Sequence, residues 1–193
     1  MSYKIAILGS GRGSNAEALL KAESRGTLGE AEIVGILSDR EDSGILKHAR
    51  DFEKAARYER YSRKTGDAAY LEILDSWAPD LVVLAGFMRI VGDGLLNRWE
   101  GKLINLHPSL LPSFKGLDAI GQAWDYGVKV SGCTVHWVNA DLDGGRVIDQ
   151  SPVPIAEDDT LDSFEAKIHA AEHLLLVDVV RRLSVGEIQY KPS

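Results

Sequence analysis

Short apolar runs alternate with helical stretches along the first half of the chain, and this alternation limits the possible folds more than any other feature. The runs cover residues 3–8, 33–37, 81–85 and 103–106. Strands that alternate with helices form parallel sheets, because each helix carries the chain back to the start of the next strand. The run Leu81–Ala85 is apolar at every position, so we expect a central strand that is covered on both faces.

The pattern changes after residue 127. Residues 132–138 alternate with the period of a half-exposed strand, and residues 147–153 read as a second strand after a turn, which predicts an antiparallel hairpin. An apolar stripe from Leu161 onward predicts a long final helix. We therefore expect a single α/β domain over residues 1–186. Its sheet should be central and mainly parallel, with a Rossmann-like N-terminal half and the hairpin at the C-terminal end, followed by a flexible tail over residues 187–193.

Size and charge exclude several classes of protein. The chain has 193 residues, enough to bury a sizeable core in one domain, and a net charge of −7 disfavours a broad nucleic-acid or membrane surface. Cys133 is the single cysteine, and its spacing to the histidines matches no metal site. The N-terminus has too few apolar residues for a signal peptide or a membrane span. We expect a cytoplasmic protein that binds no metal, nucleic acid or membrane.

A glycine-rich loop, Gly9–Asn15, follows the first apolar run and precedes a helical stretch. Its glycines allow backbone N–H groups to converge, and Ser14 with Glu17 matches a capping box at a helix start, where phosphate binds. The dinucleotide fingerprint would need glycine in place of Ser14, and the lysine of a P-loop is absent. A tight turn before a capped helix and a monophosphate site both remain open.

Asn105 and His107 lie two residues apart at the end of an apolar run. Residues at this spacing in a strand point to the same face, and Pro108 keeps His107 extended. Ligands of parallel sheets bind beyond the carboxyl ends of the strands, so this pair is a candidate site. The alternative is a histidine with ordinary structural partners beside an asparagine that forms a turn.

Two other strand ends carry polar or large apolar residues. Asp39 would bind a ribose in a nicotinamide enzyme, but the turn interpretation is favoured. The segment Gly86–Ile90 offers an apolar wall and an arginine for an anion. Its alternative, favoured on burial statistics, is a helix start with Phe87 and Met88 in the core.

Four motifs together resemble the phosphoribosylglycinamide formyltransferase family. They are Gly-Arg-Gly-Ser-Asn at 11–15, Ala-Gly-Phe-Met-Arg-Ile at 85–90, Ile-Asn-Leu-His-Pro-Ser-Leu-Leu-Pro at 104–112 and Asp-Leu-Asp-Gly-Gly at 141–145. Their order and separations are far more specific than any one motif, and they span nearly the whole chain. The resemblance implies transfer of a formyl group from 10-formyltetrahydrofolate, as co-substrate, to the amine of glycinamide ribonucleotide in purine biosynthesis, with no metal.

The resemblance also implies a role for individual residues. The catalytic group would be Asn105, His107 and Asp143. The residues that would bind glycinamide ribonucleotide are Gly13, Ser14, Asn15, Pro108 and Glu172. Those that would contact the folate are Arg63, Met88, Arg89, Ile90, Val91 and Asn105. The chain departs from the family at Arg12, where many members have asparagine, and at residues 174–176, where three leucines replace a frequent aromatic–proline pair.

The residue types fit the implied chemistry. Attack of the amine on the formyl carbon creates a tetrahedral intermediate with negative charge on oxygen, and His107 and Asn105 would each stabilise it by about 2.7 to 4 kcal/mol if they act as oxyanion-hole donors. Asp143 would keep His107 protonated, and could accept the proton of the amine directly or through water.

Four rival functions remain at this point. A formyltetrahydrofolate hydrolase shares the three polar residues but typically has an extra N-terminal domain, and methionyl-tRNA formyltransferase usually has a further C-terminal domain, so the length of this chain disfavours both. A nicotinamide-dependent oxidoreductase is disfavoured by the imperfect glycine fingerprint. A folate-binding module without catalysis would bind folate and transfer nothing. The sequence leaves open whether the protein is a monomer or a homodimer.

Overall fold

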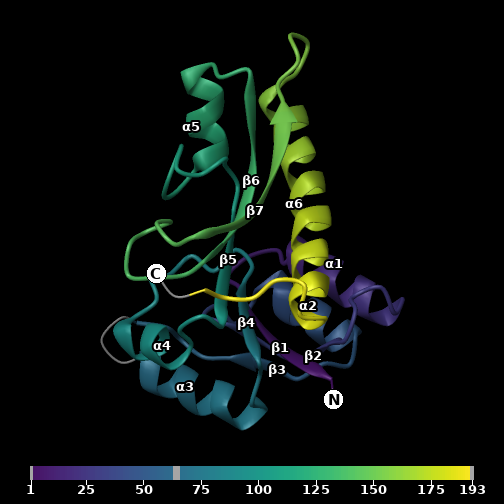
Figure 1. Ribbon diagram of the computed structural model, residues 1–193, viewed down its shortest axis with the longest axis vertical. Coiled ribbons are helices and arrows are strands. Elements are labelled where there is room, and N and C mark those ends of the chain that lie inside the picture. The colour runs from purple at the N-terminus through teal and green to yellow at the C-terminus, as the bar shows by residue number, and fades with distance from the viewer. Residues whose placement is uncertain (1, 63–65, 192–193) are drawn as a thin grey trace.

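Seven strands form a sheet in the order β3-β2-β1-β4-β5-β6-β7, with helices packed on both faces (Figure 1). The computed structural model describes residues 2–62 and 66–191. In chain order the elements are β1 (Tyr3–Leu8), α1 (Ser14–Ser24), β2 (Ala31–Ser38), α2 (Gly44–Asp51), β3 (Ala56–Tyr58), α3 (Gly66–Trp77), β4 (Leu81–Leu84), α4 (Asp93–Arg98), β5 (Leu103–His107), α5 (Ala119–Tyr126), β6 (Val130–Trp137), β7 (Val147–Pro154) and α6 (Leu161–Ser184).

The sheet has the mixed topology that the sequence predicts. Strands β1 to β5 pair in parallel, whereas β6 pairs antiparallel with both β5 and β7. The expectation of a mainly parallel sheet with a Rossmann-like first half and an antiparallel C-terminal hairpin is therefore confirmed, and β4 is the middle strand. The strand order reverses between β1 and β4. The crevice beyond the carboxyl ends of two such strands is the usual ligand position in α/β folds.

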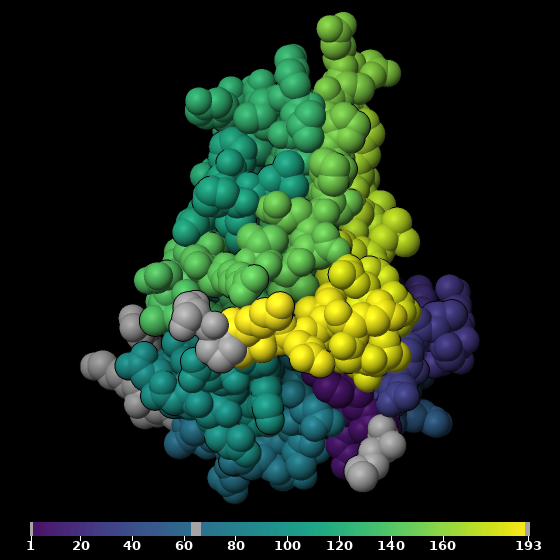
Figure 2. Space-filling view, viewed as in Figure 1, coloured from purple at the N-terminus to yellow at the C-terminus, as the bar shows by residue number. Residues whose placement is uncertain are grey.

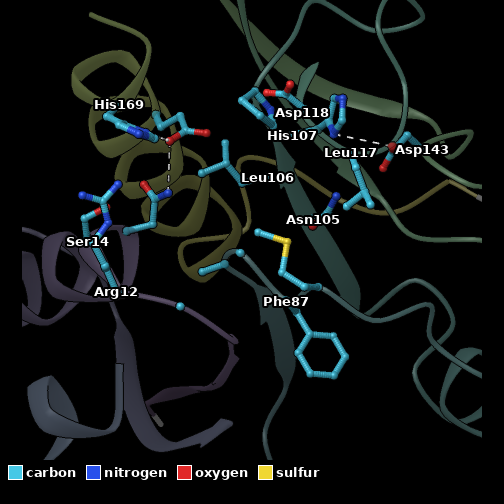
Figure 3. A pocket seen from close by; sticks show the side chains of 18 of the residues that line it. Arg12, Ser14, Phe87, Asn105, Leu106, His107, Leu117, Asp118, Asp143 and His169 are labelled. Atoms are coloured by element: carbon cyan, nitrogen blue, oxygen red, sulfur yellow. Dashed lines mark hydrogen bonds and ion pairs between the residues drawn. The ribbon is translucent and has the colours of Figure 1, made fainter. Parts of the chain in front are cut away.

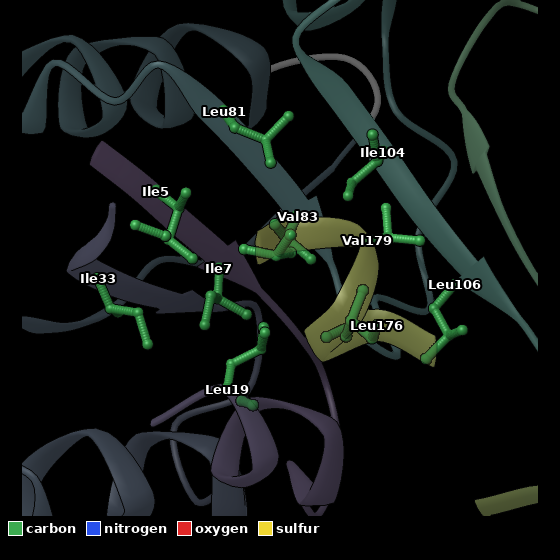
Figure 4. Packing of buried hydrophobic residues seen from close by; sticks show 14 of the residues in the cluster. Ile5, Ile7, Leu19, Ile33, Leu81, Val83, Ile104, Leu106, Leu176 and Val179 are labelled. Atoms are coloured by element: carbon green, nitrogen blue, oxygen red, sulfur yellow. The ribbon is translucent and has the colours of Figure 1, made fainter. Parts of the chain in front are cut away.

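Helices cover the two faces of the sheet because the parallel strands are apolar on both. Residues Ile5, Ile7 and Val83 face one core, where α1, α2 and α6 contribute Leu19, Ile45, Leu176 and Val179 (Figure 4). Residues Leu8, Val82 and Leu84 face the other core, built with Tyr70, Leu74 and Leu95 from α3 and α4. Full burial of each large aliphatic side chain stabilises the fold by about 1.5–3 kcal/mol.

The hairpin β6–β7 extends the sheet, and α5 and α6 flank it in Figure 1. A third apolar cluster joins Ala123 of α5, Val153 of β7 and Phe164 of α6. The helix α6 begins with a capping box in which Thr160 and Ser163 exchange side-chain and backbone hydrogen bonds.

The expectation that β6 is half exposed is wrong, because residues 131–137 are all buried. One reason is that the loop after β5 packs over this strand, and the backbone N–H of Leu111 donates to Thr134 Oγ1 at 3.1 Å.

One local prediction in the first half is also wrong. The N-cap of α1 is Gly13, with φ of 84°, and no side chain caps the helix, so Ser14 and Glu17 do not form a capping box. Glu17 instead pairs with Lys21 at 2.7 Å. A Cβ atom on Gly13 would lie 2.6 Å from Ile45 Cα, so this turn admits only glycine. After α2 the chain turns into β3, which covers only Ala56–Tyr58.

The C-terminal segment lies against the base of the hairpin (Figure 2). The rings of Tyr190 and Trp137 make an edge-to-face contact at 5.2 Å between centroids, and Ile188 packs against the main core. The domain boundary at residue 186 and the tail over 187–193 remain predictions. None of the helices in the described ranges combines the length and hydrophobicity of a transmembrane span.

Candidate active site

The antiparallel pairing of β5 with β6 brings four polar side chains together. Asn105 lies opposite His136, and His107 lies opposite Thr134. His107 is 5% exposed, His136 is 2% exposed and Thr134 is fully buried. Buried polar groups of this kind need specific partners, because each loses its hydrogen bonds to water.

His107 has a backbone partner on one ring nitrogen and a carboxylate near the other. Its Nε2 lies 2.8 Å from the carbonyl oxygen of Phe114, and since a carbonyl only accepts, Nε2 carries a hydrogen and donates. Nδ1 lies 3.5 Å from Asp143 Oδ2 (Figure 3). Phe114 has a φ of 54°, an uncommon backbone conformation for a bulky residue. The carbonyl of this strained residue fixes the ring, so that Nδ1 faces Asp143.

Asp143 is held by the turn between β6 and β7. Its Oδ2 accepts a hydrogen bond from the backbone N–H of Gly116 at 2.8 Å, and its φ is 46°. Gly145, two residues later, packs so closely that a Cβ atom there would lie 1.7 Å from the carbonyl oxygen of Trp137. The tight packing of the turn therefore positions this carboxylate beside His107.

A second histidine, His136, orients Asn105. The Asn105 Nδ2 group donates to His136 Nε2 at 3.1 Å, and His136 Nδ1 donates to the carbonyl oxygen of Trp137 at 2.8 Å. Burial lowers the pKa of His136 below its ordinary value, which favours the neutral ring that this arrangement requires. His136 was not singled out in the sequence analysis. The signal that could have indicated it is a polar histidine within the predicted strand over residues 132–138.

The loop after β5 is anchored to the hairpin. Thr134 Oγ1 donates to the carbonyl of Ser109 at 2.6 Å and accepts from Gln150 Nε2 at 2.9 Å, while the same Gln150 group also lies 3.0 Å from the carbonyl of Leu111. These bonds fix the position of the loop that begins with Pro108, next to the catalytic candidate His107.

A cavity of about 960 Å³ lies over these residues (Figure 3). Eleven of the residues singled out in the sequence line it: Gly13, Ser14, Asn15, Met88, Arg89, Ile90, Asn105, His107, Pro108, Asp143 and Glu172. Val91 is not among the lining residues, and its side chain is buried in the core with Leu95. Arg63 lies outside the described residues.

One end of the cavity is formed by the start of α1 and the middle of α6. Asn15 Nδ2 donates to Glu172 Oε2 at 3.2 Å, and His169 Nδ1 lies 2.8 Å from the same oxygen. Glu172 is 4% exposed, so the ordinary assumption that a charged helix residue faces water fails here. Sequence reasoning also missed His169, whose spacing of three residues from Glu172 places both side chains on one helix face.

The other end of the cavity is apolar and lies beyond β4. Met88 and Ile90 are 58% and 57% exposed, while Phe87 is buried. The prediction that a helix starts here with Met88 in the core is therefore wrong. The backbone N–H of Met88 donates to Ser10 Oγ at 2.9 Å, and Arg89 Nε lies 2.5 Å from Asp39 Oδ2. The segment that carries Met88 and Ile90 is thus fixed to the ends of β1 and β2.

No group of three or more His, Cys, Asp or Glu side chains suited to a metal ion occurs within residues 2–62 and 66–191. The arrangement instead offers an amide, an imidazole and a carboxylate around one point of the cavity wall. Such a set can donate hydrogen bonds to a developing oxyanion and transfer protons.

A family model described as formyl transferase matches residues 3–180, and the chain belongs to this family. It is 40% identical over 187 residues to a phosphoribosylglycinamide formyltransferase of Bacillus subtilis, covering 93% of this chain and 94% of that protein. A glycinamide ribonucleotide transformylase 1 from Symbiobacterium toebii has a similar crystal structure, with a TM-score of 0.94 and 38% identity, covering 98% of this chain and 91% of that one.

The chain is also 37% identical to a trifunctional purine biosynthetic protein, adenosine-3, of Bos taurus, covering 96% of this chain but only 19% of that longer protein. The resemblance to phosphoribosylglycinamide formyltransferases that the four motifs indicate is thus confirmed across nearly the full chain.

Proposed function

We propose that this chain transfers the formyl group of 10-formyltetrahydrofolate to the amine of glycinamide ribonucleotide. The observation that carries the proposal is the meeting of Asn105, His107 and Asp143 at one cavity, with a helix N-terminus at one end and an apolar wall at the other. The names of its relatives support the same reaction.

In this proposal the acceptor occupies the end formed by α1 and α6. The backbone N–H groups at the start of α1, from Gly13, Ser14 and Asn15, bind the phosphate, since free N–H groups and the helix dipole attract anions. Glu172 binds the ribose hydroxyls through the carboxylate oxygen that Asn15 leaves free. Pro108 lies against the glycinamide group, next to His107.

The folate occupies the apolar end. Met88 and Ile90 are exposed side chains that cover the pteridine or benzoyl rings. Arg63 provides positive charge for the carboxylates, and Arg89, whose Nε pairs with Asp39, offers them its remaining N–H groups. Val91 stays in the proposed folate-binding set, and because its side chain is buried, its contact would have to come from its backbone. Asn105 lies between the two ends of the cavity, where it contacts the folate and the reacting group.

The reaction proceeds by addition and elimination. The lone pair of the acceptor amine forms a bond to the formyl carbon, and the C=O π electrons move to oxygen. Asn105 has one N–H committed to His136, so its second N–H donates to this oxygen. His107 has Nε2–H committed to Phe114, so the Nδ1–H of the imidazolium is the remaining donor. Two donors of this kind stabilise the charge by about 2.7 to 4 kcal/mol each.

Asp143 completes the mechanism in two ways. Its negative charge, 3.5 Å from Nδ1, stabilises positive charge on His107, and it can accept the proton that the amine nitrogen loses. The intermediate then collapses. The bond between the carbon and the folate nitrogen breaks, the electron pair goes to that nitrogen, and His107 supplies the proton.

One assay tests the proposal. Purified protein is given 10-formyltetrahydrofolate with and without glycinamide ribonucleotide, and loss of the formyl donor is followed. The proposal predicts loss that depends on the amine, with formylated acceptor as product. Loss without the amine identifies a hydrolase, and binding without loss identifies a folate-binding module.

We further propose that the protein acts in the cytoplasm, as a monomer or homodimer, without nucleic acid. The net charge of −7 and the single buried cysteine support this setting.

A further inference from the structure

His169 lines the acceptor end of the cavity, and the mechanism above gives it no role. Its Nδ1 lies 2.8 Å from Glu172 Oε2 and its Nε2 lies 3.3 Å from Glu165 Oε1. Ionised carboxylates only accept hydrogen bonds, and only the protonated imidazole has two N–H groups to donate. The hydrogen bond to Glu172 accordingly raises the pKa of His169 above its ordinary value. Both contacts favour a charged ring.

Arg12 is a second cation at this end. Its side chain is exposed, lines the cavity, and makes no ion pair with any residue that the structure describes. Figure 3 shows Arg12, Ser14 and His169 on the same side of the cavity. A phosphate at the start of α1 would therefore lie at the end of the cavity that these two residues line.

A phosphate bound here meets an electrostatic problem, because the buried carboxylate of Glu172 is close to the same helix end. Asn15 binds that carboxylate directly and belongs to the first turn of α1. Two anions brought together in a partly desolvated site repel each other unless cations lie between them. The Nδ1 contact of His169 offsets the charge of Glu172. The longer Nε2 contact, to a Glu165 side chain that is 44% exposed, can be exchanged for a phosphate oxygen.

We propose that protonated His169, together with Arg12, binds the phosphate of the acceptor, so that affinity for glycinamide ribonucleotide falls as pH rises. This inference rests on the proposed function, because it takes a phosphorylated acceptor at this end as given. It assigns a specificity-determining contact to a residue that the reaction chemistry does not use. An acceptor that lacks a phosphate would gain nothing from it.

The direction of the pH effect depends on the charged and titratable groups near His169. Glu165 and Glu172 contact it and His173 follows on α6, while Glu17 and Lys21 on α1 act on His173. Arg12 and Asp118 line the same cavity, and His48 on α2 faces Glu17. Burial lowers the pKa of His173, the direction opposite to that of His169. The raised pKa of His169 means that the contact is present at low pH and is lost as pH rises through that pKa.

The test measures binding of glycinamide ribonucleotide by calorimetry, without folate, from about pH 6 to about pH 9, a range that spans histidine titration. At the low-pH end of this range, His169→Gln should bind glycinamide ribonucleotide about tenfold more weakly than the wild type, the value of one charge-assisted hydrogen bond. At the high-pH end, the two dissociation constants should agree within about twofold. Because ionisation of the phosphate itself is the same for every variant, it cancels in the ratio of dissociation constants.

Two further variants separate the proposed contact from general effects. Glu165→Gln keeps His169 but removes one partner that raises its pKa, so the decline in affinity should move to lower pH. Lys167→Gln removes a positive charge from the same helix, at a side chain that pairs with Asp159 and lies outside the cavity lining. This variant should follow the wild type at every pH.

A ratio between His169→Gln and wild type that is constant over the pH range would overturn the inference, since it would mean that His169 only orients Glu172. An equal loss in Lys167→Gln would overturn it as well, because general electrostatics would then suffice. If the wild type transfers formyl groups to glycinamide ribonucleotide but the ratio is constant, only this inference fails. If the wild type neither binds nor formylates glycinamide ribonucleotide, the proposed function fails with it.

Discussion

Replacing Asp143 by asparagine removes one negative charge while leaving the shape of the side chain nearly unchanged. Asp143 Oδ2 accepts from the N–H of Gly116, and the carboxamide oxygen of the substituted side chain can accept the same bond. The substitution therefore keeps the contact with Gly116 but removes the negative charge that faces His107, whose Nδ1 lies 3.5 Å away, together with the proposed acceptor of the amine proton.

The size of the effect follows from that distance. Two unit charges at 3.5 Å interact by about 5 kcal/mol at an effective dielectric constant of about 20, and by about 1 kcal/mol in bulk water. The side chains of His107 and Asp143 are only 6% and 9% exposed, so screening by water is weak and the larger value is the better guide. Part of the interaction is offset by desolvation. We expect kcat to fall by about 100- to 1000-fold, since each 1.36 kcal/mol changes a rate about tenfold.

The assay is turnover with both substrates saturating, accompanied by a thermal melt of each variant. Asp141→Asn is the matched control, because Asp141 is an exposed carboxylate of the same turn and lies outside the cavity lining. This control should retain wild-type turnover. If Asp143→Asn is folded and turns over within about threefold of Asp141→Asn, the electrostatic role of Asp143 is refuted.

Two other substitutions probe the support of the site. His136→Phe keeps an aromatic ring but removes the acceptor for Asn105 Nδ2, so kcat should fall at least about tenfold with little change in KM. His136→Gln offers an amide oxygen as acceptor and should recover most of the lost kcat. Steady-state kinetics of both variants test this prediction. Gly145→Ala places a Cβ atom against the carbonyl oxygen of Trp137, so the turn that carries Asp143 must move. We expect the free energy of unfolding, measured with denaturant, to fall by about 2–4 kcal/mol. Most of the turnover should be lost as well.

The architecture could be predicted from the sequence because the parallel strands are apolar on both faces. The run Leu81–Ala85 identifies the central strand by its composition alone, and the alternation with helices predicts the parallel pairing. The burial of β6 could not be predicted in the same way. Its alternating pattern is typical of a half-exposed strand, but the loop that covers Thr134 comes from a distant part of the chain.

The site could be predicted only in part, for a related reason. Asn105 and His107 share a strand, so their proximity follows from the period of the backbone. His136 meets Asn105 only through the pairing of β6 with β5, and His169 reaches the cavity only through the packing of α6, so the local sequence around either histidine does not indicate its contact. At the start of α1, the pattern Ser14-Asn-Ala-Glu17 favoured a capping box, but packing against Ile45 makes Gly13 the N-cap instead.

The most direct test of the central claim, that donors from β5 stabilise a developing oxyanion, is single-turnover formyl transfer by His107→Ala with both substrates bound. The account predicts a rate at least about 100-fold below the wild type, the loss of one oxyanion-hole donor, with a cooperative thermal melt that shows an intact fold. A folded His107→Ala protein that transfers the formyl group within about threefold of the wild-type rate would contradict it.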